Sequence, residues 1–89
     1  MTIIQYLNNA FVFVRKTIYN SIMEFSLIFK NLRLREKLTQ KELAQELNIP
    51  QSTIAKYEKG QLEANYKNLI KIANFFNVTI DHLFGRDNQ

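Results

Sequence analysis

Apolar residues recur at every third or fourth position through residues 26–86, a spacing that gathers side chains on one face of an α-helix. Polar and charged residues fill the positions between them. This pattern predicts five helices, at about residues 27–37, 39–47, 51–58, 66–76 and 79–84. No run of alternating apolar and polar residues indicates a strand in this part of the chain. An all-α domain is therefore expected.

Residues that favour helix ends lie where the pattern breaks. Thr39 and Glu42 have the spacing of a capping box, in which each side chain accepts a hydrogen bond from the backbone amide of the other. Asn48 tolerates the left-handed conformation that ends many helices, and Gly60 is a natural terminator. Pro50 is expected at the first position of the third helix, where its missing N–H costs nothing. The second and third helices are thus separated by a tight turn.

The segment from Thr39 to Gly60 meets the demands of a helix-turn-helix unit. Ala44 supplies a small residue where the two helices must approach each other. Ile54 and Tyr57 supply the apolar face that packs the second helix against the first, and the remaining surface of that helix is polar. A unit of this kind can lay its second helix in the major groove of DNA and read base edges there.

The residues of this segment, and those that follow it, resemble the phage Cro and cI repressor family, also called the XRE family of bacterial regulators. The matching positions are Gln40, Glu42, Leu43, Ala44, Leu47, Ile49, Ser52, Thr53, Ile54, Tyr57, Glu58 and Gly60, then Leu69, Ile72, Ala73, Phe76, Val78, Asp81 and Leu83. The resemblance covers about residues 26–86. It implies a five-helix, lambda-repressor-like DNA-binding domain that binds a double-stranded operator as a homodimer. The implied function is a sequence-specific transcriptional regulator of a bacterium or phage, acting as a repressor.

The resemblance also implies which polar residues contact DNA. Gln40 would bond a backbone phosphate and help to orient the recognition helix. Gln51, Ser52 and Lys56 would face base edges, because glutamine pairs well with adenine and lysine with guanine. The alternatives are that Gln40 is an ordinary first-turn helix residue and that the other three form a solvated helix face.

Four further residues take supporting roles in this comparison. Thr53 and Lys59 would contact phosphates, which position a protein without reading sequence. Arg33 resembles the family arginine that pairs with the glutamate at Glu58, and this pair would tie the first helix to the end of the third. Alternatively the pair is exposed, and exposed ion pairs contribute only about 0 to 1 kcal/mol.

The chain departs from the family at several turns. Where glycine is usual it has Lys37, Asn48 and Asn77. Asparagine tolerates a positive φ, whereas Lys37 would cost about 1 kcal/mol if its φ is positive. Pro50 replaces a serine or threonine that caps the recognition helix and contacts phosphate. The loop at residues 61–65 lacks the basic residues common in the family, so fewer phosphate contacts are expected from it.

Residues 1–25 are additional to the family pattern. Apolar residues recur here at spacings of three, four and seven, at Ile4, Leu7, Phe11, Val14, Ile18 and Phe25. This seam predicts an extra N-terminal helix that serves dimerisation or packing. The alternatives are a chain start at Met23, a strand at residues 11–14 and a helix on a membrane surface. The expected domains are therefore an extension at residues 1–25, a DNA-binding domain at 26–86 and a tail at 87–89.

If the extension binds another protein as its main role, the chain is instead an antitoxin-like or adaptor protein.

Composition bears on metal sites, enzymatic activity and location. There is no cysteine, and His82 is the only histidine, so neither a metal nor a cofactor is expected. No nucleophile, base and acid are grouped together, so an enzyme is not expected, and no small-molecule ligand is evident. The net charge of +4 favours a polyanionic partner, and without an apolar run long enough for a membrane span the chain is expected in the cytoplasm.

Overall fold

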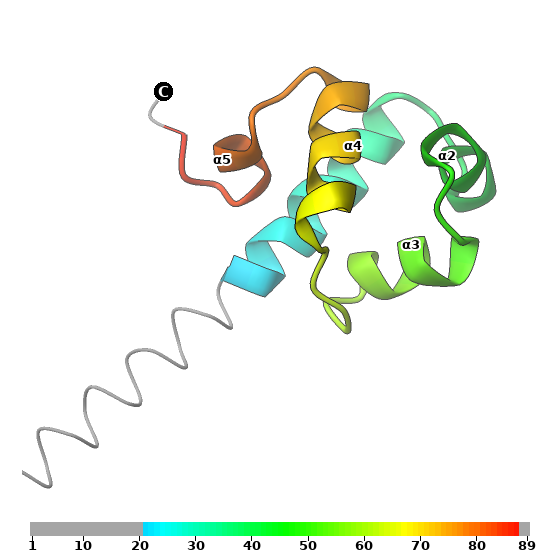
Figure 1. Ribbon diagram of the computed structural model, residues 1–89, viewed down its shortest axis with the longest axis horizontal. Coiled ribbons are helices and arrows are strands. Elements are labelled where there is room, and N and C mark those ends of the chain that lie inside the picture. The colour runs from blue at the N-terminus through cyan, green and yellow to red at the C-terminus, as the bar shows by residue number, and fades with distance from the viewer. Residues whose placement is uncertain (1–20, 88–89) are drawn as a thin grey trace, which may run out of the picture.

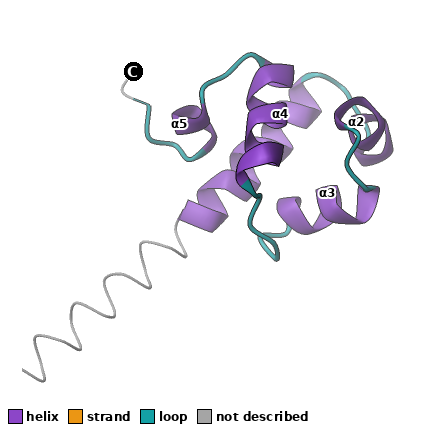
Figure 2. Cartoon of the chain, in the orientation of Figure 1, coloured by secondary structure: helices purple, strands orange, loops and turns teal. Residues whose placement is uncertain are grey.

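The computed structural model describes residues 21–87 of the 89-residue chain. Over these residues the chain forms five helices and no strand (Figure 1, Figure 2). An N-terminal helix at residues 21–35 is followed by α2 (Gln40–Leu47), α3 (Gln51–Glu58), α4 (Tyr66–Phe76) and α5 (Ile80–Leu83). The predicted all-α, five-helix fold is confirmed. Most of the expected extra helix falls on residues 1–20, outside the described residues.

The N-terminal helix differs from its prediction at both ends. The pattern predicts residues 27–37, but the described helix already includes residue 21 and ends at residue 35. Phe25, predicted to belong to the seam of the extension, lies instead in the core of the domain with 3% of its surface exposed. The spacing of Phe25 fits both the apolar seam predicted for residues 1–25 and the core-facing side of the helix. Spacing alone therefore could not show which of the two surfaces Phe25 belongs to. The predicted boundary at residue 25 therefore falls inside a helix of the domain.

Aromatic rings from the N-terminal helix, α3, α4 and the residue after α5 meet in the centre of the core. The ring of Tyr57, 2% exposed, lies edge-on to those of Phe25 and Phe29, with 5.9 Å between centroids in both pairs. Phe84 contacts Phe25, and Phe76 contacts Phe29. Full burial of one such side chain stabilises a fold by about 1.5–3 kcal/mol. Tyr57 thus anchors α3 to the N-terminal helix.

Side-chain caps begin three of the helices. The predicted capping box of α2 is confirmed, because Thr39 Oγ1 accepts from the amide of Glu42 at 3.0 Å and Glu42 Oε1 accepts from the amide of Thr39 at 2.9 Å. Asn65 caps α4 and Thr79 caps α5. The prediction for Pro50 is wrong by one position, since this residue is the N-cap of α3 and makes no capping bond. The start of α3 therefore lacks the side-chain cap that α2, α4 and α5 have.

Among residues 21–87, three residues other than glycine adopt a positive φ: Lys37 at 58°, Asn48 at 54° and Asn77 at 55°. Each follows the end of a helix, and each is a position at which the resemblance to the Cro and cI family leads us to expect glycine. Asparagine adopts this left-handed conformation at little cost, whereas the Cβ of lysine crowds the following carbonyl oxygen. Lys37 is therefore the strained residue among the three.

We expect Lys37→Gly to raise the free energy of unfolding by about 1 kcal/mol. The substitution removes the cost of roughly 1–2 kcal/mol that a residue with a Cβ pays in the left-handed conformation. Glycine also has more conformational freedom in the unfolded chain, which lowers the free energy of unfolding and offsets part of this stabilisation. Urea denaturation of the full chain measures the change. Asn48→Gly is the matched control, with a smaller expected effect, and a loss of stability in Lys37→Gly would contradict the assignment of strain.

Candidate DNA-binding surface

Packing fixes which face of α3 points outward. Leu43, Ala44 and Leu47 of α2 are buried, as are Ile54 and Tyr57 of α3. The turn between the two helices includes the left-handed residue 48, whose backbone N–H is bonded to carbonyls in the last turn of α2. With its apolar face covered, α3 lies at the edge of the molecule and exposes its opposite face (Figure 1).

The outward face of α3 carries most of the residues predicted to contact DNA. Successive residues of an α-helix are about 100° apart, so Gln51, Ser52, Lys56 and Lys59 fall within an arc of about 140°. All four side chains are exposed, and Lys59 is the C-cap of the helix. The structure therefore brings these four residues together on one surface, opposite the buried face.

Two residues beside this group differ in position. Thr53, predicted to contact phosphate, is half-buried at the margin of the face, and its amide is bonded to the carbonyl of Pro50. Ala55, also half-buried, lies in the middle of the exposed arc, one turn from both Gln51 and Lys59. Sequence reasoning missed Ala55 because alanine has no polar group, although its spacing of four from both residues would have identified it.

The surface continues onto α2. A shallow depression of about 540 Å³ lies where the first residue of α3 meets the outer side of α2. Lys41 and Gln45 of α2 line it together with Gln51. These two side chains from α2 were not among the predicted contact residues. The sequence of α2 does not indicate that these two side chains lie next to α3. Only the way in which the two helices cross places them there.

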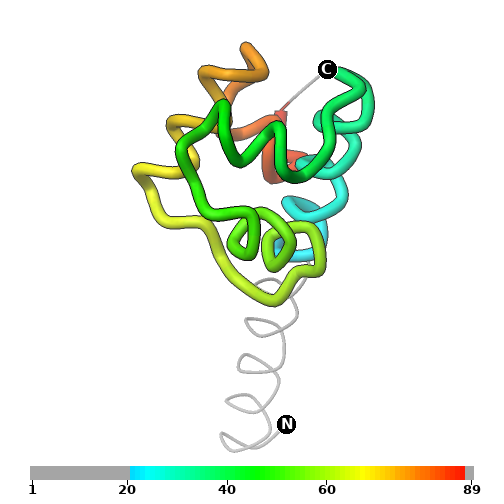
Figure 3. Tube along the Cα trace, turned by 90° about the vertical axis from the view of Figure 1, so that its right-hand side faces the viewer, coloured from blue at the N-terminus to red at the C-terminus, as the bar shows by residue number. Residues whose placement is uncertain are grey.

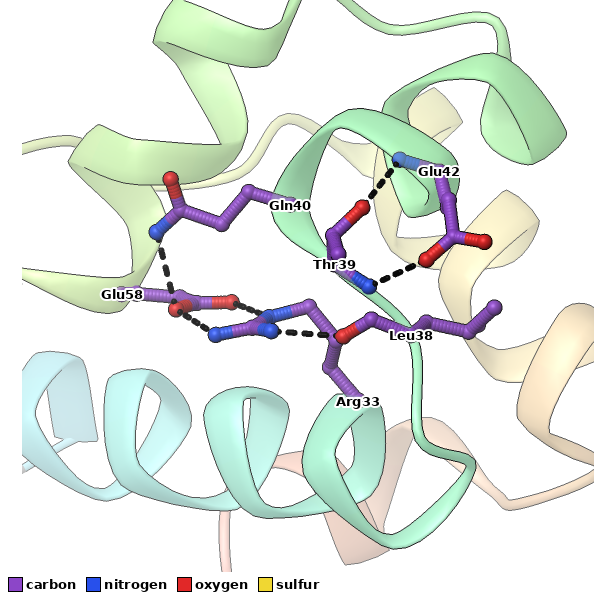
Figure 4. A network of polar contacts seen from close by, with 6 residues as sticks. All are labelled: Arg33, Leu38, Thr39, Gln40, Glu42 and Glu58. Atoms are coloured by element: carbon purple, nitrogen blue, oxygen red, sulfur yellow. Dashed lines mark hydrogen bonds and ion pairs between the residues drawn. The ribbon is translucent and has the colours of Figure 1, made fainter.

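At the other end of α3, Glu58 accepts hydrogen bonds from two other elements (Figure 4). Arg33 donates from Nε to Glu58 Oε2 at 2.5 Å and from Nη2 to Glu58 Oε1 at 2.9 Å, and its Nη1 donates to the carbonyl of Leu38 at 2.7 Å. The side chains of Arg33 and Glu58 are only 9% and 4% exposed, so the alternative of an exposed pair is wrong. This bidentate pair joins the N-terminal helix, the turn before α2 and the last residue of α3.

Gln40, the first residue of α2, belongs to the same network. Its Nε2 donates to Glu58 Oε1 at 3.1 Å. An ionised carboxylate only accepts hydrogen bonds, so the amide nitrogen of Gln40 must face Glu58. This bond uses one of the two N–H groups on that nitrogen, and Glu58 thereby fixes the direction in which the other one points.

The network changes the acid–base behaviour of Glu58. Burial disfavours the charged carboxylate and raises its pKa, but this effect is outweighed. Hydrogen bonds from Arg33 and Gln40, with the positive charges of Arg33 and Lys30, hold the pKa of Glu58 below its ordinary value of 4.5. The ionised group therefore stabilises the fold fully above pH 4.5, and this contribution is lost as the pH falls through the lowered pKa.

No group of three metal-ligating side chains occurs within residues 21–87, and none of the helices there is long and apolar enough to span a lipid bilayer. His82 has a partner of its own, since its Nδ1 lies 2.7 Å from Oδ2 of Asp87. This contact links α5 to the segment that follows it.

The buried α2–α3 pair and the polar, outward face of α3 define a helix-turn-helix domain. The chain belongs to the helix-turn-helix family HTH_3, of the XRE type, whose family model matches residues 29–83. This span includes α2 to α5 and all the residues of the Glu58 network.

Two relatives and one solved structure agree with this assignment. An HTH-type transcriptional regulator of Bacillus subtilis, YqaE, is 39% identical over 73% of this chain, and the transcriptional activator BcrR of Enterococcus faecalis is 41% identical over 71%. The crystal structure of a transcriptional regulator from Listeria innocua superposes on 73% of the chain with a TM-score of 0.66 and 28% identity. The matched regions make up 57%, 31% and 61% of these three proteins, so the chain resembles only part of each.

We expect Glu58→Gln to lower the free energy of unfolding at neutral pH by about 3 kcal/mol, because the buried charge of Arg33 loses its partner. Its stability should also change less between pH 5 and pH 3 than that of the unsubstituted chain, since the titrating group is gone. Urea denaturation at several pH values measures both effects. Glu46→Gln, at an exposed position of α2, is the control for a simple change of charge. An equal loss in the two variants would contradict the role of the network.

Proposed function

We propose that this chain is a sequence-specific, DNA-binding transcriptional regulator that reads the major groove with α3. The observation that carries the proposal is the polar face of α3, exposed along its length while the helix is anchored by buried packing and by the Glu58 network. Base recognition requires side chains on a rigid element, because a loosely held helix loses geometric precision. Family membership and relatives named as transcriptional regulators support the same function.

Base reading falls to three exposed side chains of α3. Gln51 presents a donor and an acceptor that match adenine, and Lys56 presents donors to O6 and N7 of guanine. The hydroxyl of Ser52 serves either base. Ala55, between them on the arc, places a methyl group where the methyl of a thymine fits. Together these side chains would read one operator half-site.

Phosphate contacts position the helix in the groove. Lys59 lies beyond the base-reading residues at the end of α3, and Thr53 lies at the margin of the face. Gln40 adds a neutral contact, because its second amide N–H remains to donate to a phosphate oxygen while Glu58 holds the first. The net charge of +4 attracts the chain to DNA at long range.

The regulator acts as a homodimer in the cytoplasm, bound to the nucleoid. Two copies related by a two-fold axis would place their α3 helices in half-sites one helical turn apart, about 34–36 Å. The segment before residue 21 takes part in this association, and the helical domain that follows it binds the DNA. Where the operator overlaps a promoter, the bound dimer represses transcription by excluding the polymerase.

Lys56→Ala should relax the preference at one base position and weaken binding to the selected operator by about 1–3 kcal/mol. Lys59→Ala should weaken binding to every sequence alike, and lower the slope of log K against log salt by about 0.9. Selection from a random DNA pool, followed by titrations at two salt concentrations, separates the two results. The two results differ because a contact to a base depends on the DNA sequence, whereas a contact to a phosphate is the same at every sequence.

The control is Arg35→Ala, which removes a positive charge beside His82, next to α5 rather than α3. It should leave base preference intact. If the unsubstituted chain binds DNA with strong salt dependence and no base preference, the sequence-specific function is wrong. A chain that binds no DNA at either salt concentration would instead favour an adaptor role.

Gln40→Met removes the amide donors while keeping the length of the side chain. A hydrogen bond to a charged group contributes about 1.5–3 kcal/mol, so operator binding should weaken by that amount at every sequence. The salt slope should stay unchanged, because Gln40 carries no charge. Asn74→Leu, which removes an exposed side-chain amide from α4, is the control, and equal affinities for the Gln40 variant and the unsubstituted chain would contradict the phosphate contact.

A further inference from the structure

The depression between the outer side of α2 and the start of α3 has polar and apolar parts. Of the residues that line it, Lys41, Gln45 and Gln51 are exposed, whereas Ala44 and Ile49 are buried. Figure 3 views the molecule from the side on which these two helices lie. We call Lys41 and Gln45, the polar residues that α2 contributes beside Gln51, the α2 rim.

The exposed residues of α2 are separated by charge. Successive residues of a helix are about 100° apart, so Lys41 and Gln45 lie within about 40° of each other on one flank. Glu42 and Glu46 each lie about 100° further round, and neither lines the depression. The lining therefore includes one cation and no carboxylate. The flank of α2 next to Gln51 suits a polyanion, and the acidic flank faces elsewhere.

We propose that the α2 rim binds the DNA backbone beside the half-site, next to the base that Gln51 reads. The proposal rests on the proposed function, because Gln51 must lie in the major groove for the rim to reach this backbone. Lys41 pairs with a phosphate oxygen, and the side-chain amide of Gln45 donates to the same phosphate or to its neighbour. These two residues extend the contact beyond the bases that α3 reads.

The position and chemistry of the rim favour the backbone over a base. In a helix-turn-helix unit the second helix enters the major groove while the first crosses the backbone. The ammonium group of a lysine is a point charge on a flexible stem, which suits a phosphate and requires no exact geometry. Ala44, Ile49 and Pro50 add apolar surface to the depression, against which the carbon atoms of a deoxyribose can lie.

The contact differs from the one proposed for Gln40, although Gln40 and Lys41 are neighbours in the chain. Gln40 is bonded to Glu58 at the end of α3, whereas Lys41 lies in the depression with Gln51 at its start. The two ends of α3 are seven residues apart, or about 10 Å along the helix axis. Gln40 and Lys41 therefore meet different phosphates, one near each end of the recognition helix.

The first experiment replaces single phosphates of the selected operator by neutral methylphosphonates. Gln51→Ala locates the base that Gln51 reads, as the position at which base preference relaxes. For the unsubstituted chain, a replacement just beyond that base should weaken binding by about tenfold, because a hydrogen bond to a charged group is lost. Lys41→Ala should weaken binding to the unmodified duplex by about the same factor, and should lose little more on the modified one.

The matched control is Arg35→Ala, which removes a positive charge next to α5. This variant should keep the full tenfold sensitivity to the same methylphosphonate. Lys41→Ala should also lower the slope of log K against log salt by about 0.9, and Arg35→Ala should not. Circular dichroism checks that the variants are folded.

A second experiment tests Gln45. Gln45→Glu keeps the size of the side chain and places a negative charge beside the phosphate, so binding should weaken by about tenfold at every sequence. Asn74→Asp makes the same change of an exposed amide to a carboxylate on α4 and should have a much smaller effect.

Three outcomes would overturn the proposal while leaving the proposed function intact. The first is a chain that binds its operator with base preference and loses no more affinity in Lys41→Ala than in Arg35→Ala. The second is a loss from Lys41→Ala that adds in full to the loss from every methylphosphonate. The third is a relaxed preference at one base in Lys41→Ala, which would show that Lys41 reads a base. A chain that binds no DNA would overturn both proposals.

Discussion

The carboxylate of Glu58 joins three parts of the molecule. Arg33 reaches it from the N-terminal helix, Gln40 reaches it from the start of α2, and Glu58 itself is the last residue of α3. The third N–H donor of Arg33 holds the carbonyl of Leu38 in the turn before α2. Because the pair is buried, removing either charge leaves the other without a partner, which is far more costly than breaking an exposed pair. The end of α3 is therefore held against the N-terminal helix and the start of α2 by one carboxylate.

Two anchors of different physical character hold α3 in place. Tyr57 packs among the aromatic rings of the core, a non-directional contact that fixes how deep the helix lies. Glu58 forms directional hydrogen bonds, which fix the rotation of α3 about its axis and the position of its C-terminal end. The hydroxyl of Tyr57 also accepts from Asn68 Nδ2 at 2.9 Å, which connects α3 to α4. With these groups engaged, the opposite face of the helix is free to meet a partner.

Local chemistry explains which parts of the fold were predictable. The capping box at Thr39 depends on neighbours in sequence, and its prediction was confirmed. The prediction for the left-handed turn at Asn48 was confirmed for the same reason. The limits of the N-terminal helix were wrong because the apolar period continues through Phe25 without a break, and only the core shows where that ring is buried. Ala55 was missed because it has no polar group, although its spacing of four from Gln51 and Lys59 places it on the same face of α3.

By itself, the sequence determined the number and type of the helices, the turn between α2 and α3, and which face of α3 is apolar. These features follow from periodicity and from residues that cap or end helices, all of which act over a few positions. Only the tertiary structure decided that Arg33 and Glu58 are buried, that Gln40 shares their network, and that Met23 meets the turn at Gly60. These contacts join residues far apart in the chain, so they depend on how the helices cross. Spacing along one helix carries no information about that crossing.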